Sequence, residues 1–369
     1  MRILWLDPFH SGSHAAVADG YIAHSRHDVA LLALSAAGGW RWRMRGAAVT
    51  LARMLRERPQ HFDLLVATDM LDLATFLGLT RDLLGDLPAV LYVHENQLTY
   101  PLPPGRARDM AFPWINYTSA LAAHTVCFNS AFHRQAFLEA LPGLLGRYYD
   151  HQELDLIDTI AAKARVLPPG IDLARLDVPA SRRAEHQPDT HGSRPPLILW
   201  NSRWEYDKGP ELFFAALRAL EARGVDFRLA ALGAHVDPNE PNFRAAREWL
   251  GPRALAWGYA PGASYRDWLW RSDVVVSCAT QEFFGISVVE AMYCGCVPIL
   301  PRRLSYPELL PAAEHAACLY DGHDDLVEKL HAAILGLPAL RERDFRGAAA
   351  RYDWSVLAPE YDALFASVA

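Results

Sequence analysis

Short apolar runs rich in β-branched residues alternate along this chain with segments of helical periodicity, and the alternation occurs in two series. Strands that alternate with helices predict parallel sheets covered by helices on both faces. The polar, proline-rich residues 181–196 separate the series, so we expect two doubly wound α/β domains. The expected strands are residues 3–7, 29–34, 64–67, 90–94, 125–128 and 166–170, then 197–201, 227–232, 255–257, 274–277 and 297–300, and the first expected helices lie near 14–25, 46–57, 71–84, 107–122 and 131–140.

These patterns predict a first domain over residues 1–175, a linker over 176–196 and a second domain over 197–351. At 369 residues, the chain is long enough for two hydrophobic cores. Residues 142–163 interrupt the first series and are expected to form a helical insertion, to which the sequence assigns no role.

The composition limits the surroundings and the partners of the protein. No apolar run approaches the roughly 18 residues that span a bilayer, and Asp7 comes too early for a signal peptide, so we expect a cytoplasmic location without membrane contact. The five cysteines lie in apolar surroundings and are expected to be reduced thiols, not metal ligands. With a formal net charge of −7, any contact with nucleic acid requires a local basic patch.

A strand, a loop and a helix are predicted over residues 273–291, with the helix beginning near Gly285. The unpaired amides and the positive dipole end of a helix attract phosphate. Glu282 precedes this helix and Glu290 lies about one turn into it, where carboxylates suit the hydroxyls of a sugar or a ribose. This combination predicts a sugar-nucleotide site; the alternative is that Glu290 only caps or solvates the helix. The other expected members of the site are Phe284, Gly285 and Ile286.

Two cations follow the strand at 197–201, at the end where doubly wound sheets bind ligands. Arg203 and Lys208 are predicted to contact a nucleotide diphosphate, whose negative charge grows as the sugar leaves. The alternative is a solvated pair at the start of a helix. Gly233, after the next strand, would let the backbone pass near the nucleotide, and Tyr259 lies where the base would be held.

Polar residues also follow strands of the first series. Residues 94–97 end the strand at 90–94, where polar groups have no packing purpose; the alternative is that His94 is a buried histidine with satisfied hydrogen bonds. Gly12 and Ser13 follow the first strand and would let a ligand approach the backbone.

Tryptophan and arginine interleave over residues 40–45, and Glu57 is the only acid between residues 40 and 58. Aromatic rings stack on unpaired bases with about 1–3 kcal/mol per base, and arginines contact phosphates. The run predicts a local acceptor surface for nucleic acid; the alternative is a solvated basic helix face whose two tryptophans fill the edge of a core. The residues concerned are Trp40, Arg41, Trp42, Arg43 and Arg45.

Together these motifs resemble two nested families. Glu282 and Glu290, with seven residues between them, resemble the signature of retaining GT-B glycosyltransferases of the glycogen-synthase-like group. Across residues 12–290 the chain resembles, more narrowly, the tRNA-queuosine α-mannosyltransferase family. The segments that carry this resemblance are Gly12-Ser13-His14, Trp40-Arg41-Trp42-Arg43, Tyr92-Val93-His94-Glu95-Asn96-Gln97, Phe128-Asn129-Ser130, Arg203-Trp204-Glu205-Tyr206-Asp207-Lys208, Trp257-Gly258-Tyr259 and Glu282-Phe283-Phe284-Gly285.

The resemblance implies a GT-B fold, in which two Rossmann-like domains face a central cleft and a C-terminal helix over 352–369 returns to the first domain. It implies retaining transfer of mannose from GDP-mannose to the cyclopentenediol of queuosine in a tRNA anticodon loop, without a cofactor or a metal. In such enzymes the loop at His94 reaches the donor sugar, so His94 joins Arg203, Lys208 and Glu282 as an expected catalytic residue. The expected acceptor contacts in this loop are Glu95, Asn96 and Gln97.

The residues alone lead only to a transferase that uses a sugar nucleotide, and they favour neither guanine nor uracil. Two alternatives stay open: a GT-B enzyme with a lipid, polysaccharide or small-molecule acceptor, and a catalytically silent RNA-binding protein on the same fold.

Overall fold

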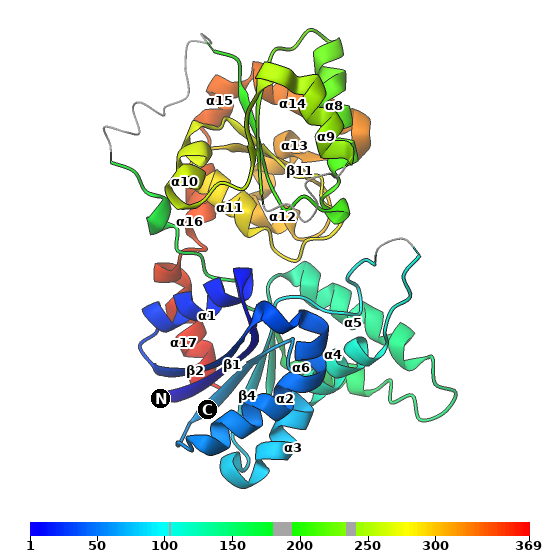
Figure 1. The fold of residues 1–369 in the computed structure, drawn as a ribbon, viewed down its shortest axis with the longest axis vertical. Helices are drawn as coiled ribbons and strands as arrows, with labels where there is room; N and C mark the ends of the chain where they lie inside the picture. Colours follow the sequence, from blue (N-terminus) through cyan, green and yellow to red (C-terminus); the bar gives the residue numbers. More distant parts are fainter. Residues whose placement is uncertain (103–104, 180–193, 234–240) are drawn as a thin grey trace. The chain divides into compact units, whose positions relative to one another are not determined.

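The structure is a computed structural model that describes residues 1–102, 105–179, 194–233 and 241–369. The chain divides into unit 1, Met1–Ile171 with Tyr352–Ala369, and unit 2, Asp172–Arg351. Each unit contains a six-stranded sheet of parallel strands with helices on both faces, which confirms the expected α/β class (Figure 1). The centre of the predicted linker, residues 180–193, lies outside the described residues.

In unit 1 the strand order is β2-β1-β3-β4-β5-β6, so the direction of winding reverses between β1 and β3. Doubly wound sheets bind ligands at such a reversal, beyond the carboxyl ends of the strands. The middle strands are buried on both faces, which explains their continuous apolar sequence. The strands are β1 Arg2–His10, β2 Asp28–Ser35, β3 Leu64–Thr68, β4 Ala89–Val93, β5 Thr125–Phe128 and β6 Ala164–Val166.

Most helices of unit 1 lie where the sequence predicts them, but α2 begins at Trp40, earlier than expected. The tryptophan–arginine run is therefore part of a helix. The helices are α1 Gly12–His24, α2 Trp40–Glu57, α3 Leu73–Leu84, α4 Ala111–Ala122, α5 Ala131–Leu145, α6 Leu156–Lys163 and α17 Trp354–Ala366, with a short 3₁₀ turn η1 at Ala36–Gly38.

Helix α17 packs against the first helix of the chain and completes unit 1. The indole of Trp354 is buried and fills the space above two glycines: a Cβ at Gly20 would lie 1.9 Å from this ring, and one at Gly170 would lie 2.3 Å from it. The phenol of Tyr21 donates a hydrogen bond of 2.9 Å to the buried carboxylate of Asp362. Residues at the two ends of the chain therefore share one core.

In unit 2 the strand order is β12-β11-β10-β7-β8-β9, which is the Rossmann order 3-2-1-4-5-6 counted from β7. The winding reverses between β7 and β10. Only β12 was not predicted, because a strand of two residues leaves no pattern in the sequence. The strands are β7 Leu197–Asn201, β8 Arg228–Leu232, β9 Ala254–Gly258, β10 Val274–Val276, β11 Val297–Pro301 and β12 Leu319–Tyr320.

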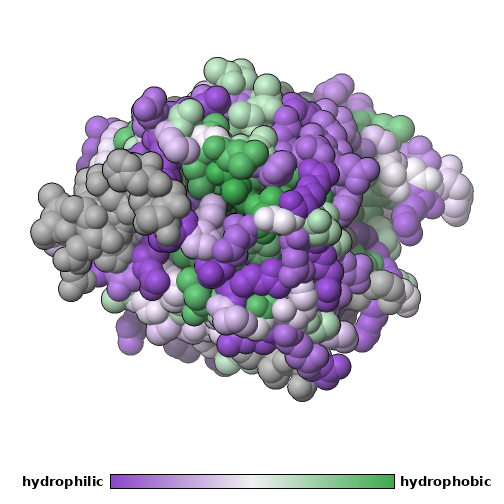
Figure 2. Space-filling view, turned by 90° about the horizontal axis from the view of Figure 1, so that it is seen from above, coloured by the Kyte–Doolittle hydropathy of each residue, from purple (hydrophilic) through white to green (hydrophobic). Residues whose placement is uncertain are grey.

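The helices of unit 2 cover both faces of its sheet (Figure 1). In the view from above, apolar residues form a patch near the centre among mainly hydrophilic residues, with smaller apolar areas elsewhere (Figure 2). The helices are α8 Pro210–Ala222, α9 Pro241–Leu250, α10 Gly262–Arg271, α11 Ile286–Tyr293, α12 Tyr306–Leu309, α13 His315–Cys318, α14 Gly322–Leu335, α15 Leu337–Arg341 and α16 Phe345–Ala350, with 3₁₀ turns η2 Ala174–Leu176, η3 Tyr206–Lys208, η4 Gly251–Arg253 and η5 Ala312–Glu314.

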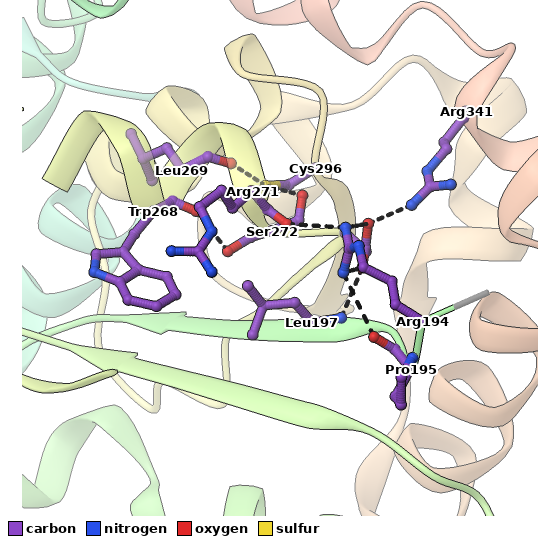
Figure 3. A network of polar contacts seen from close by, with 10 residues as sticks. Arg194, Pro195, Leu197, Trp268, Leu269, Arg271, Ser272, Cys296 and Arg341 are labelled. Carbon is purple, nitrogen blue, oxygen red and sulfur yellow. Dashed lines mark hydrogen bonds and ion pairs between the residues drawn. The ribbon is translucent and has the colours of Figure 1, made fainter. Parts of the chain in front are cut away.

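A buried carboxylate organises the amino ends of the strands in unit 2. Asp273 is 1% exposed, and it accepts hydrogen bonds from the amide of Leu197 at 2.7 Å and from Arg194 at 3.0 and 3.1 Å. Arg341 forms a further ion pair with the same carboxylate (Figure 3). The network therefore joins the starts of β7 and β10 to the segments that carry these two arginines.

Two simple properties follow from the described ranges. All five cysteines are buried and free, as expected. No helix of the described residues combines the length and the apolar character that crossing a membrane requires.

Candidate active site

In unit 2 the loops that follow β7 and β10 are in direct backbone contact. The amide of Thr280 donates to the carbonyl oxygen of Asp207 at 2.7 Å. Gly209 has a φ of +68°, and a Cβ there would lie 2.3 Å from the carbonyl oxygen of Cys278. A side chain at this position would separate the loops, so the glycine is what allows them to meet where the sheet reverses its winding.

Lys208 and Glu282 come from these two loops and lie together. The Nζ of Lys208 is 3.5 Å from Oε2 of Glu282 and 3.2 Å from Oδ2 of Asp207. It also donates a hydrogen bond of 2.9 Å to the carbonyl oxygen of Gln281. Lys208 is 7% exposed, whereas the side chain of Glu282 is 27% exposed. The ammonium group is thus a charge in a fixed position, and the carboxylate beside it is partly open.

Arg203 lies on the same loop as Lys208 but is far more open, with 53% of its side chain exposed. Its Nη2 is 3.2 Å from Oε2 of Glu205, whose pKa is raised by burial, an effect that the positive charge of Arg203 opposes. Gly233, at the end of β8, has a φ of +144°, and a Cβ there would lie 2.1 Å from the carbonyl oxygen of Ser202. Glycine therefore lets the end of β8 pack against the backbone of the Arg203 loop, and the approach of Gly233 to a nucleotide stays a prediction.

Glu290 lies in the second turn of α11 and is 4% exposed. The phenol of Tyr265 donates to its Oε2 at 2.7 Å, and Arg175 forms an ion pair with its Oε1. Burial and the charge of Glu290 raise the pKa of Tyr265 well above its usual value, so this phenol remains a hydrogen-bond donor at neutral pH. Glu290 is therefore neither a helix cap nor a solvated carboxylate, and a hydroxyl that reached it would compete with these two partners.

Helix α11 begins at Ile286, directly after Gly285, as the sequence predicts. Gly285 has a φ of +106°, a conformation that essentially requires glycine. The side chain of Phe284 is 4% exposed, so any contact of this residue with the sugar nucleotide would involve its backbone. Its carbonyl oxygen already accepts a hydrogen bond of 2.9 Å from Ser305. Tyr259, after β9, is 71% exposed.

In unit 1 the loop after β4 is held by three buried polar side chains. Asp69, which follows β3, accepts a hydrogen bond of 2.7 Å from the amide of His94. Asn129 donates to the carbonyl oxygen of His94 at 2.8 Å, and Asn116 accepts from the amide of Gln97 at 2.8 Å. Burial raises the pKa of the Asp69 carboxyl well above its usual value. These contacts fix the shape of the loop without any ligand.

The rings of His14 and His94 lie against each other, with their centroids 4.1 Å apart. Burial lowers the pKa of His14 to about 4 and that of His94 well below its usual value, so both rings are neutral at pH 7. Among the described residues, neither Nδ1 of His14 nor Nε2 of His94 has a hydrogen-bond partner. His94 is therefore not a satisfied core histidine. Gly12, with a φ of +54°, and the exposed Ser13 begin α1 beside this pair.

Two members of the tryptophan–arginine run point into unit 1. The ring of Trp40 packs against Phe112 of α4 at a centroid distance of 5.1 Å. Arg43 donates two hydrogen bonds, of 2.7 and 3.1 Å, to the carbonyl oxygen of Ser35. These two side chains support the start of α2, which agrees in part with the alternative that the tryptophans fill the edge of a core.

The other members of the run face solvent. Trp42 is 61% exposed, and Arg41 and Arg45 are also exposed. The guanidinium of Arg41 lies 4.5 Å from the centroid of the Trp40 ring, and Arg45 pairs with Asp109. An exposed tryptophan on a helix that also carries exposed arginines is a combination that suits single-stranded nucleic acid.

Comparison with known proteins gives a family match for each unit and one relative that is similar along most of the chain. Residues 2–171 match the family described as tRNA-queuosine alpha-mannosyltransferase N-terminal, and residues 181–345 match glycosyl transferases group 1. Over 330 residues the chain is 31% identical to the tRNA-queuosine alpha-mannosyltransferase of Drosophila melanogaster, covering 89% of this chain and 86% of that protein. This chain belongs to the tRNA-queuosine alpha-mannosyltransferase family.

Further similarities extend this result. The GDP-mannose:cellobiosyl-diphosphopolyprenol alpha-mannosyltransferase of Xanthomonas campestris is 25% identical to this family member, over 78% of this chain and 69% of its own. The sucrose-phosphate synthase of Thermosynechococcus elongatus has the same fold, with a TM-score of 0.73 at 15% identity, covering 100% of this chain and 98% of that one. This member of the tRNA-queuosine alpha-mannosyltransferase family is thus a glycosyltransferase with the GT-B fold.

Three residues that shape the site of this family member were not predicted. Asp69 follows a buried strand in the same way as His94, so the rule that identified His94 would also have found Asp69. Tyr265 and Arg175, which hold Glu290, lie on an ordinary helix and in a 3₁₀ turn. No local pattern in the sequence distinguishes them from other tyrosines and arginines.

Proposed function

We propose that this glycosyltransferase transfers mannose from GDP-mannose to the cyclopentenediol of queuosine in a tRNA anticodon loop, with retention of configuration. The observation that carries the proposal is the similarity, along both units, to the Drosophila tRNA-queuosine alpha-mannosyltransferase. GDP-mannose is supported by the donor in the name of the Xanthomonas relative. Because tRNA is the proposed acceptor, we place the reaction in the cytoplasm.

On the donor side, the bond between C1 of mannose and the diphosphate oxygen breaks, and negative charge develops on the leaving GDP. Lys208 is proposed to stabilise this charge, because its ammonium group is already fixed by Asp207 and Glu282. Arg203 is proposed to reach the same diphosphate from the open side of the loop, and the first amides of α11 to add their dipole. With charge supplied in this way, we expect no metal requirement.

On the acceptor side, a hydroxyl of queuosine attacks C1 from the face that the diphosphate leaves. The new C1–O bond forms as the old one breaks, and the hydroxyl proton passes to an oxygen of the departing phosphate. His94 stays neutral and is proposed to hydrogen-bond a hydroxyl of the mannose instead of exchanging protons. Glu282 is proposed to accept a hydrogen bond from the sugar, and Glu290 from the ribose.

For the tRNA, we propose contacts with the exposed face of α2. Trp42 would stack on an unpaired base, while Arg41 and Arg45 would contact neighbouring phosphates. The loop after β4 would supply the remaining acceptor contacts. Its Gln97 donates a hydrogen bond of 3.0 Å to Glu95, which orients both side chains.

The test is incubation of the protein with bulk tRNA and labelled GDP-mannose, followed by digestion to nucleosides and mass spectrometry. The expected product is queuosine with one added hexose, formed in the presence of EDTA and absent when the tRNA lacks queuosine. UDP-glucose and UDP-mannose serve as donor controls. Transfer of the label to lipid would support the alternative acceptor, and tRNA binding without any donor hydrolysis would support a catalytically silent protein.

A further inference from the structure

Unit 1 contains a cavity of about 220 Å³ that the proposed reaction does not use. It lies between α4, the end of α5 and the segment that leads to α6, which is the insertion without a role in the sequence analysis. Ligand pockets for drug-sized molecules measure about 300–1,000 Å³, so this one suits a smaller group. It is lined by Trp114, Tyr117, Leu145, Tyr148, Asp150, His151, Gln152 and Glu153.

Three aromatic rings form one side of the cavity. The ring of Trp114 lies 5.3 Å from that of Tyr117 and 5.6 Å from that of Tyr148. Tyr117 is 3% exposed, whereas Trp114 is 39% and Tyr148 is 50% exposed. A ring that only completes a core is buried on all sides. Here only the ring of Tyr117 is buried, while those of Trp114 and Tyr148 are partly exposed to solvent. This arrangement offers aromatic faces to an inserted planar group.

Carboxylates form the other side. Asp150 and Glu153 line the cavity, and burial, with the nearby charge of Glu153, raises the pKa of the Tyr117 phenol. Carboxylates accept hydrogen bonds and repel phosphate, so a ligand that contacts them must present hydrogen-bond donors, either N–H or O–H. His151 and Glu153 have φ values of +45° and +51°, which residues with a side chain rarely adopt. The segment therefore adopts an unusual backbone where its acidic side chains line the cavity.

An exposed arginine adjoins the cavity in the chain. Arg147 directly precedes Tyr148, one of the rings that line the cavity. Arg108, which precedes α4, donates to the carbonyl oxygens of Gln97 and Tyr100 and is therefore already engaged. An exposed cation next to an aromatic and acidic cavity fits a chain in which planar bases alternate with phosphates, and this cation would repel a small organic cation.

We propose that this cavity binds an unpaired base of the acceptor RNA, with the adjacent phosphate at Arg147. The base stacks on the exposed ring of Tyr148 and meets Trp114, whose ring plane is inclined by 64° to that of Tyr148, at its edge. Its amino or imino groups donate to Asp150 or Glu153. Guanine is the preferred base, because its imino and amino donors lie side by side and match a carboxylate, whereas uracil has a single donor. The inference rests on the proposed function in taking RNA as the acceptor.

The test compares Tyr148→Ala with a matched control, Tyr149→Ala, because Tyr149 is the next residue, is 97% exposed and does not line the cavity. Loss of one stacked ring weakens tRNA binding by about 5- to 150-fold, and the control should stay within about twofold of wild type. Fluorescence anisotropy with labelled tRNA gives the affinities, and thermal melts confirm folding. Equal affinities for the two variants would overturn the proposal.

A second measurement uses the fluorescence of Trp114 and does not depend on the folding of Tyr148→Ala. Guanosine monophosphate should cause quenching that saturates, uridine monophosphate should bind more weakly, and Glu153→Gln should reduce this preference; the Trp114→Phe variant identifies the signal. Saturable quenching by tetramethylammonium and not by guanosine monophosphate would overturn the proposal in favour of a site for an organic cation.

The outcomes also separate this inference from the proposed function. If mannose is transferred to tRNA while the KM for tRNA is the same in Tyr148→Ala and in wild type, the pocket assignment is wrong and the proposed function stands. If tRNA binding depends on Tyr148 but no mannose is transferred, the pocket stands and the proposed function is wrong.

Discussion

Replacement of Lys208 by alanine tests the donor site most directly. A charge about 4 Å from a phosphate oxygen contributes about 4 kcal/mol at an effective dielectric constant of about 20. The carboxylates of Asp207 and Glu282, 3.2 and 3.5 Å from Nζ, offset part of this effect. We therefore expect the loss of transition-state stabilisation to be about 2.7–4 kcal/mol, which lowers kcat by about 10²- to 10³-fold.

The same change also affects stability, because Asp207 is 1% exposed and would lose its cation. Breaking a buried pair on one side costs about 3–5 kcal/mol. For a unit of this size each kcal/mol shifts Tm by about 2–4 °C, so we expect Tm to fall by about 6–20 °C. Turnover must therefore be measured well below the Tm of the variant, with folding checked by circular dichroism.

The chain offers a matched control, because Lys208 is one of only three lysines and Lys329 lies in the same unit. Lys329, on α14, donates to the carbonyl oxygen of Ala316. The assay is single-turnover release of GDP from saturating GDP-mannose in the presence of tRNA. Lys329→Ala should retain the wild-type rate. A folded Lys208→Ala protein whose rate is within about threefold of wild type would refute the assignment of this charge to the leaving group.

Three further predictions concern other parts of the molecule. Trp42→Ala should weaken tRNA binding by about 1–3 kcal/mol without changing the affinity for GDP-mannose, whereas alanine at Val49, 60% exposed on the same helix, should have no effect; equal losses would exclude stacking on Trp42. Asp273→Asn should destabilise unit 2 by about 3–5 kcal/mol, measured by urea unfolding, because two arginines lose their charged partner; an unchanged midpoint would show that the network is not stabilising. Burial lowers the pKa of His14 to about 4 and that of His133 to about 3. As the pH falls, these histidines are therefore protonated in the unfolded chain before they are protonated in the folded protein. The stability of unit 1 should then be complete above about pH 6.5 and fall progressively towards pH 4, and His133→Gln should reduce the difference in urea midpoint between pH 7 and pH 5.

The fold could be predicted where burial on both faces gave strands a continuous apolar sequence, as in β3, β4 and β5. The start of α2 was placed too late, because residues 40–45 were interpreted for their chemistry, although arginine is a good helix former. Strand β12 was missed because its pairing with β11 depends on the neighbouring strand and not on its own two residues.

The candidate site could be predicted where it lies on strand ends. Lys208 and Glu282 are distant in the sequence, but their loops follow β7 and β10, which are adjacent in the sheet. The partners of Glu290 could not be predicted, because Tyr265 and Arg175 reach it from segments whose packing depends on the complete unit. The exposure of Trp42 likewise could not be predicted, because it depends on which side of α2 packs against the rest of unit 1.

Helix α17 has a consequence for the order of events during synthesis. Trp354 and Asp362 complete a core that begins with residues such as Tyr21, yet unit 2 is made between them. While the ribosome translates residues 172–351, the first sheet lacks its last helix and exposes apolar side chains that Trp354 will later cover. Unit 2 is continuous in the chain and can finish folding first. The half of the protein that is translated earliest is therefore the half that matures last, and a nascent chain that stalls before Trp354 would be a substrate for chaperones.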